Sequence, residues 1–218
     1  MRTLVCLVVC FWAFEAVATT PTRDDEITTC NVSEVPTWPD GVDAPISGTR
    51  LQFAYRHEGA PRWMSAEQVL SKIQRATQAW SSCGLDIGVV EAKRGSSWAR
   101  ASTILIQWDS AHSFGHFGVA DRANHRLTLG PSAFELLKAK APEAMDYALQ
   151  LVISHEMGHF LGLQRHSRRC ADVMSYYSDE VGAECVSAVP NWKSRYREYR
   201  SHLPTACDIQ RCKQLNKR

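Results

Sequence analysis

The segment HEMGHFLGLQRH, which begins at His155, has residue types and a spacing that can bind a metal and activate water. His155 and His159 are four residues apart, so on a helix they project from one face and can bind the same zinc ion. Glu156 is placed to accept a proton from water at that ion, which is its general-base role in this motif. Gly162 allows a positive φ that ends the helix, and His166 follows in the loop as a third nitrogen ligand.

Three histidine ligands would leave one coordination position open for water, as catalytic zinc sites require and structural sites do not. The cysteines are poor alternatives as ligands, because none of them has the CxxC spacing of a zinc site. We therefore predict one catalytic Zn²⁺, bound by His155, His159 and His166, with Glu156 as the general base.

A methionine eight residues beyond His166, Met174 in the segment DVMSY, extends the motif. The long pattern HExxHxxGxxH followed by a methionine turn is the signature of the metzincin clan of zinc endopeptidases, and this sequence resembles it. The stretch looks like bacterial matrixin-type and snapalysin-like enzymes, and VMSY is similar to the methionine turn of serralysins and astacins. The resemblance implies that Met174 forms a hydrophobic floor beneath the ligands and that Tyr176 binds the metal and then stabilises the oxyanion. A packed aromatic is the alternative for Tyr176.

The resemblance also implies an α+β fold of the metzincin-like zincin type. We expect a twisted mixed sheet and two long helices in an N-terminal lobe, with a small disulfide-tied lobe at the C-terminal end. The implied function is that of a secreted zinc endopeptidase, a matrixin-like metalloprotease that hydrolyses peptide bonds in a protein or peptide substrate. The alternatives are a non-catalytic zinc-fold protein that binds or inhibits, and a zinc amidase acting on cell-wall peptides.

One position departs from the family pattern. The third ligand should stand three residues after the glycine, where this chain has Arg165, and arginine stays protonated and cannot bind zinc. A one-residue insertion in the loop, with His166 as the ligand, is the simplest explanation. Asp172 is the alternative third ligand.

A further group of histidines, with two aspartates nearby, makes a second zinc ion possible. Its members are His112, His116, His125, Asp109 and Asp121. Loop histidines near the rim of a cleft are the simpler interpretation. Ca²⁺ bound by surface aspartates is also possible, although no DxDxDG-like run specifies it.

The N-terminal residues 1–18 are typical of a cleaved export signal, with a basic start, an apolar run and Ala-Val-Ala at its end. The apolar run is too short to span a membrane. Removal of the signal leaves six of the eight cysteines, and an oxidising compartment makes three disulfides the expected outcome. Cys170–Cys185 is the most plausible local pair, and Cys30 is expected in a disulfide rather than as a free thiol. We predict a secreted or periplasmic protein.

Composition agrees with a folded domain. The 218-residue chain is 44% hydrophobic and 22% charged, which excludes a disordered or collagen-like protein, and its net charge of +2 does not indicate nucleic-acid binding. We expect a monomer without nucleic acid and without stable membrane insertion.

Four segments are expected: the signal at 1–18, an irregular leader at 19–47, a catalytic domain at 48–190, and a basic C-terminal helix and tail at 191–218. Hydrophobic periodicity predicts strands and helices within the domain. The strands are expected at 50–55, 85–90, 103–108, 117–120 and 126–129, and the helices at 65–80 and 142–161. In the tail, Trp192, Tyr196, Tyr199 and Leu203 would share one helical face.

Overall fold

A five-stranded mixed sheet is the framework of the computed structural model, which describes residues 20–92, 103–179 and 181–217. The strand order is β2-β1-β3-β5-β4. The first four strands in this order are parallel, and the edge strand β4 runs antiparallel to β5. Their bounds are β1 Arg50–Tyr55, β2 Asp86–Glu91, β3 Thr103–Trp108, β4 Gly118–Asp121 and β5 Arg126–Leu129. All five strands predicted from periodicity are present, within one residue at each end.

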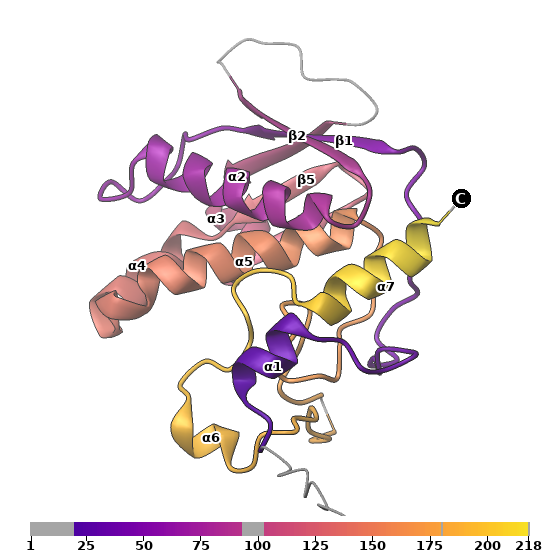
Figure 1. Ribbon diagram of the computed structural model, residues 1–218. Coiled ribbons are helices and arrows are strands. Elements are labelled where there is room, and N and C mark those ends of the chain that lie inside the picture. The colour runs from indigo at the N-terminus through magenta and orange to yellow at the C-terminus, as the bar shows by residue number, and fades with distance from the viewer. Residues whose placement is uncertain (1–19, 93–102, 180, 218) are drawn as a thin grey trace, which may run out of the picture.

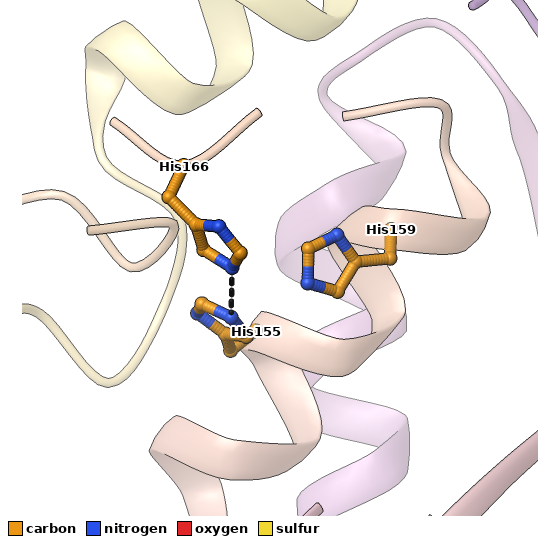
Figure 2. A group of neighbouring side chains, drawn as sticks. All are labelled: His155, His159 and His166. Carbon is orange, nitrogen blue, oxygen red and sulfur yellow. Dashed lines mark hydrogen bonds between the residues drawn. The ribbon is translucent and has the colours of Figure 1, made fainter. Parts of the chain in front are cut away.

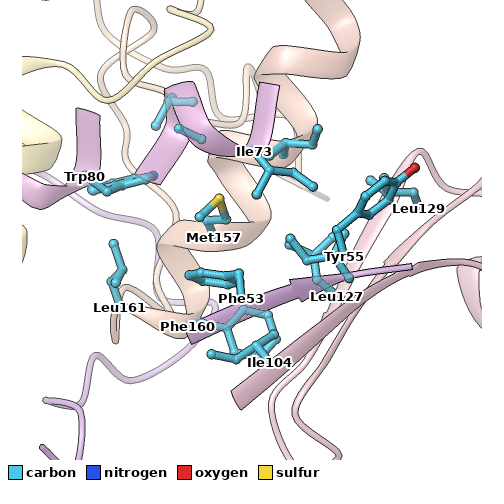
Figure 3. Packing of buried hydrophobic residues seen from close by; sticks show 14 of the residues in the cluster. Phe53, Tyr55, Ile73, Trp80, Ile104, Leu127, Leu129, Met157, Phe160 and Leu161 are labelled. Atoms are coloured by element: carbon cyan, nitrogen blue, oxygen red, sulfur yellow. The ribbon is translucent and has the colours of Figure 1, made fainter. Parts of the chain in front are cut away.

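Two long helices, α2 (Ala66–Ser81) and α5 (Met145–Phe160), lie side by side on one face of the sheet (Figure 1). Helix α2 begins where expected, because Ser65 and Gln68 form a capping box. Apolar side chains of both helices pack on those of the strands around Phe53, Ile104 and Met157 (Figure 3). The buried Trp80 indole donates a hydrogen bond to the Ser154 carbonyl oxygen at 2.9 Å, which joins α2 to α5 next to the predicted zinc ligands.

Three short helical segments lie between β3 and α5 in the sequence: α3 (Ser110–Ser113), which contacts β4 and β5, and α4 (Pro131–Lys140) and the 3₁₀ turn η1 (Pro142–Ala144), which contact α5. Helix α4 is absent from the sequence prediction, although Pro131 at its first position is a common start signal. Helix α5 ends where predicted, with Gly162 at φ +99°. A Cβ on Gly162 would lie 2.2 Å from the Ala44 carbonyl oxygen, so glycine is required both for the turn and for the close approach of the leader.

The leader is not wholly irregular, because it contains helix α1 (Arg23–Thr28), capped by Thr22. Three disulfides are present, as expected: Cys30–Cys207, Cys83–Cys212 and Cys170–Cys185. The first two connect the leader and the end of α2 to the C-terminal helix α7 (Ala206–Asn216). The third confirms the predicted local pair.

The predicted helical face in the C-terminal tail is wrong. Helix α6 covers only Trp192–Arg195, and the chain then continues without helix to α7. The Arg23 guanidinium donates to the carbonyl oxygens of Tyr199 and Arg200, both at 2.7 Å, so these backbone groups are not available for a helix. This contact comes from the other end of the chain and leaves no periodic pattern in the tail.

Three disulfides are compatible with an extracellular protein. No helix in the described part of the chain combines the length and the apolar character needed to span a bilayer. The predicted export signal lies outside the described residues, and the proposed four-segment division stays a prediction.

The disulfides differ in the length of chain that they close, which predicts different contributions to stability. In the chain-entropy model, the Cys30→Ser/Cys207→Ser double variant should lose about 4 kcal/mol of unfolding free energy, because Cys83–Cys212 still shortens the separation of 177 residues that it opens. Cys170→Ser/Cys185→Ser, at a separation of 15 residues, should lose about 3 kcal/mol. Denaturant unfolding measures both, and an equal or reversed loss would contradict the prediction.

Candidate metal centre

Three imidazole rings converge at the end of α5. One ring nitrogen from each of His155, His159 and His166 lies within 4.8 Å of the other two, and the Nε2 atoms of His155 and His166 are 3.1 Å apart (Figure 2). His155 and His159 come from consecutive turns of α5, as their spacing predicts, whereas His166 comes from the loop after the helix. The structure therefore brings together the three histidines that the sequence singled out.

Each ring has its other nitrogen, Nδ1, held by an oxygen acceptor. The acceptor is the Val173 carbonyl for His155 at 2.7 Å and the Leu163 carbonyl for His159 at 2.8 Å. For His166 it is the Asp40 carboxylate at 2.6 Å. Because a carbonyl or carboxylate oxygen can only accept, Nδ1 carries the hydrogen in each ring and Nε2 presents a lone pair. This arrangement of outer-sphere partners is typical of histidines that bind a metal.

The environment favours neutral, metal-binding imidazoles. Burial, with the neighbouring His159 and His166, lowers the pKa of His155 well below its usual value. Burial also lowers the pKa of His159 to about 4. The pKa of His166 is lowered by burial, against the opposing effect of its bond to Asp40. At neutral pH the three Nε2 lone pairs are therefore available to a cation.

Glu156 lies in the same small cavity as the histidines. The cavity has a volume of about 300 Å³ and is lined by His116 before β4 and by residues of β4, α5 and the chain after α5, including Val119, Gln164 and Tyr176. Burial raises the pKa of Glu156 to about 7, against the opposing effect of the nearby Ala120 backbone N–H. Strand β4 passes close to this carboxylate because it carries Gly118, where a Cβ would lie 2.8 Å from Glu156 Cγ.

Tyr176 and Met174 contact different parts of the site. The Tyr176 ring stacks on His166, with ring centroids 3.6 Å apart, and remains 43% exposed on the cavity side. Met174 is fully buried against α5, where a Cβ on Gly158 would lie 2.3 Å from its sulfur atom. Tyr176 thus faces the cavity, and Met174 lies beneath the helix turn that carries His159.

The cluster includes neither Arg165, which stands where the family pattern expects the third ligand, nor Asp172, the alternative ligand. Arg165 donates its Nε–H to the Gly41 carbonyl oxygen at 2.9 Å. The Asp172 carboxylate is fully buried and accepts hydrogen bonds from Ser167, Arg169 and Thr205. Burial and the charge of Asp208 raise the pKa of Asp172 to about 7. Both side chains are therefore engaged elsewhere.

The candidate residues for a second metal do not gather. His112 pairs with Asp109 at 2.8 Å, and Asp121 accepts hydrogen bonds from Asn124. His116 lines the cavity of the first site instead. Within residues 20–92, 103–179 and 181–217, the three clustered histidines form the one group that could hold a metal ion.

Comparison with known proteins defines the fold more closely than the function. No protein-family model matches the chain, and no curated protein matches it. Among 33 matching chains of solved structures is a chain of the ECX AB5 holotoxin in its GM1-bound form. That match has a TM-score of 0.52 and 12% identity, and it covers 91% of both chains. This chain shares the fold of that holotoxin chain.

These findings correct the family and function predictions. A mixed sheet with helices is α+β, as expected, but the fold match is to a holotoxin chain, so the metzincin-like fold and clan membership are not retained. The secreted zinc metalloendopeptidase and the matrixin-like type are withdrawn with them, because they rested on that clan membership. The motif misled the prediction for a physical reason. HExxH specifies a local geometry, two imidazoles and a carboxylate on one helical turn. That geometry does not by itself define a protein family or the bond that is cleaved.

The partner prediction is corrected on the same comparison. A holotoxin is an assembly of several chains, and the matched structure has GM1 bound, so the expected monomer acting on a protein or peptide substrate is not supported. The expected disulfides, in contrast, are present.

Sequence reasoning missed two carboxylates that support the site. Asp40 lies in the leader and binds His166, and nothing in the leader sequence marks it. Asp208 of α7 accepts a hydrogen bond from the Val173 N–H at 2.8 Å, and the Val173 carbonyl in turn accepts from His155. For Asp208 the sequence did contain a local signal, because Thr205 and Asp208 form the capping box at the start of α7.

The close contact between Gly158 and Met174 predicts that a larger residue at position 158 destabilises the fold. Gly158→Ala should lower the unfolding free energy by about 1–3 kcal/mol, because the new methyl group would overlap the Met174 sulfur and approach Trp80 Cζ2 at 3.1 Å. Gly88→Ala is the matched control, since its Cβ would meet nothing closer than 4.0 Å, and it should change stability by no more than about 0.5 kcal/mol. Thermal or denaturant unfolding tests both, and equal effects would refute the packing argument.

Proposed function

We propose that this chain is an exported protein with a single zinc centre that activates water. The observation that carries the proposal is the convergence of three Nε2 lone pairs, each fixed by an oxygen acceptor on Nδ1, beside the half-buried Glu156. The predicted export signal and the three disulfides support the exported location.

The donor set fits zinc. His155 and His166 present lone pairs to each other at 3.1 Å, an arrangement that is repulsive unless a proton or a cation lies between them. Imidazole nitrogen is a common zinc ligand, and three of them leave a fourth position free. When bound, the ion would supply Lewis acidity and lower the pKa of water at that free position.

The remaining residues of the cavity have roles that follow from their placement. The Glu156 carboxylate would accept a proton from the reacting water and return it to the leaving group. The close approach of β4 at Gly118 places this carboxylate at the cavity wall. The Tyr176 hydroxyl, on a ring stacked against His166, would donate to negative charge that develops on the substrate.

Zinc analysis and hydrolysis of a model ester test this proposal. The purified protein should retain about one zinc per chain after dialysis and hydrolyse p-nitrophenyl acetate in a chelator-sensitive reaction. His166→Ala should lose the zinc. Glu156→Gln should keep it but lower the rate by about 10²–10⁴-fold, the usual contribution of a general base.

Two variants serve as controls for that experiment. His112→Ala removes a histidine outside the cluster and should leave the zinc content and rate unchanged. Tyr176→Phe keeps the ring that stacks on His166 and should retain zinc while slowing hydrolysis. A native protein without zinc would refute the metal centre, and a Glu156→Gln variant as fast as the native protein would refute only the base.

We also propose that the chain functions with partner chains, because its fold matches a chain of a holotoxin over 91% of both lengths. Protein recovered from its natural secretions should then have a native mass clearly above that of one mature chain, which is smaller than the 24.5 kDa of the full sequence. Light scattering after size-exclusion chromatography would measure this mass. A single-chain mass across the micromolar range would count against the assembly and leave the zinc proposal untouched.

A further inference from the structure

The third histidine is held by a segment far away in the sequence. We define the ligand loop as residues 162–168 and the leader segment as residues 36–44. Both oxygens of the Asp40 carboxylate accept hydrogen bonds from His166. Oδ2 accepts from the ring Nδ1–H at 2.6 Å, and Oδ1 accepts from the backbone N–H at 3.1 Å. The backbone N–H of Trp38 donates to the His166 carbonyl oxygen at 2.9 Å. The leader segment therefore fixes both the backbone and the ring of His166.

The contacts continue along both segments. The Ala44 N–H donates to the Gly162 carbonyl oxygen at 3.1 Å, and the Arg168 N–H donates to the Pro36 carbonyl oxygen at 2.7 Å. The two segments are thus joined at both ends as well as at His166. The approach is close, because a Cβ on Gly41 would lie 2.9 Å from the Gln164 carbonyl oxygen.

A second carboxylate of the leader segment, Asp43, secures the middle of the ligand loop. Its Oδ1 accepts from the backbone N–H groups of Gln164 and Arg165, at 2.8 and 2.9 Å. The Arg211 guanidinium of α7 donates to both oxygens of Asp43, at 2.6 and 2.8 Å, and also to the Arg165 carbonyl oxygen. Because Asp43 and Arg211 hold the loop independently, loss of Asp40 alone should not detach it.

We propose that Asp40 is a positioning residue of the zinc centre, which aims the His166 Nε2 at the metal and makes the leader segment part of the site. This inference rests on the proposed zinc centre. The His166 side chain is only 10% exposed and that of Asp40 is 32% exposed, so their bond is partly shielded from water. A carboxylate on Nδ1 fixes the tautomer and the ring orientation and makes the imidazole a stronger donor to the metal.

Zinc affinity, measured by competition with a chromophoric chelator, tests the inference without any activity assay. Asp40→Ala should bind zinc about 10–100-fold more weakly than the native protein, the usual cost of removing an outer-sphere partner. Asp40→Asn keeps one acceptor oxygen and the side-chain shape, so its loss should be smaller. Glu34→Gln, an exposed leader carboxylate that faces no ligand, is the matched control and should bind like the native protein.

Substitution with Co²⁺ adds a readout that a purely structural role would not change. The visible absorption of bound Co²⁺ reports the ligand field, so it should shift or weaken in Asp40→Ala and stay native in Glu34→Gln. Unfolding of the metal-free proteins shows whether Asp40→Ala is folded. If it is not folded, Asp40→Asn provides the decisive comparison.

The outcomes separate the two proposals. Native affinity together with a native Co²⁺ spectrum in a folded Asp40 variant would overturn the positioning role and leave the zinc centre intact. A native protein that binds no zinc would overturn the zinc centre, and the inference with it.

Discussion

The rest of the structure depends on holding three imidazole lone pairs, those of His155, His159 and His166, close to one point. Without a cation, the Nε2 atoms of His155 and His166 repel each other at 3.1 Å, so the surrounding protein has to hold them there. Each ring is held through its Nδ1–H by a different support: the turn at Val173, the loop at Leu163 and the leader at Asp40. Helix α5 carries two of the rings, and the third depends on segments from both ends of the chain.

Those two ends are connected to each other. Arg211 and Asp208 lie on the same helix, α7, so one element supports both the ligand loop, through Asp43, and the turn at Val173. The disulfide Cys30–Cys207 joins the leader to the start of that helix, and Cys83–Cys212 joins α7 to the end of α2. Because a cleaved leader would stay attached through Cys30, these contacts argue against a leader that is released as a separate prodomain.

The sequence predicted features whose cause is local. The capping box at Ser65 placed α2, the apolar alternation placed five strands, and the four-residue spacing placed two histidines on one face of α5. It could not predict Asp40, because a hydrogen bond across 126 residues leaves no periodicity and needs no neighbouring motif. The helical face expected in the tail failed for the same reason, since Arg23 at the opposite end holds the backbone of Tyr199 and Arg200. Clan membership was also inferred from a local motif, and the fold comparison corrected it.

The extra residue before His166 shows why spacing means different things in helices and loops. On α5, moving a histidine by one position would rotate its side chain by about 100° and remove it from the cluster. In the ligand loop, Arg165 occupies the added position, and its backbone N–H and guanidinium bond to Asp43 and Gly41 of the leader segment. His166 therefore still faces His155, one residue later than the motif prescribes. The leader provides acceptors for this added residue, so the loop spacing and the leader have to be considered as one structural unit.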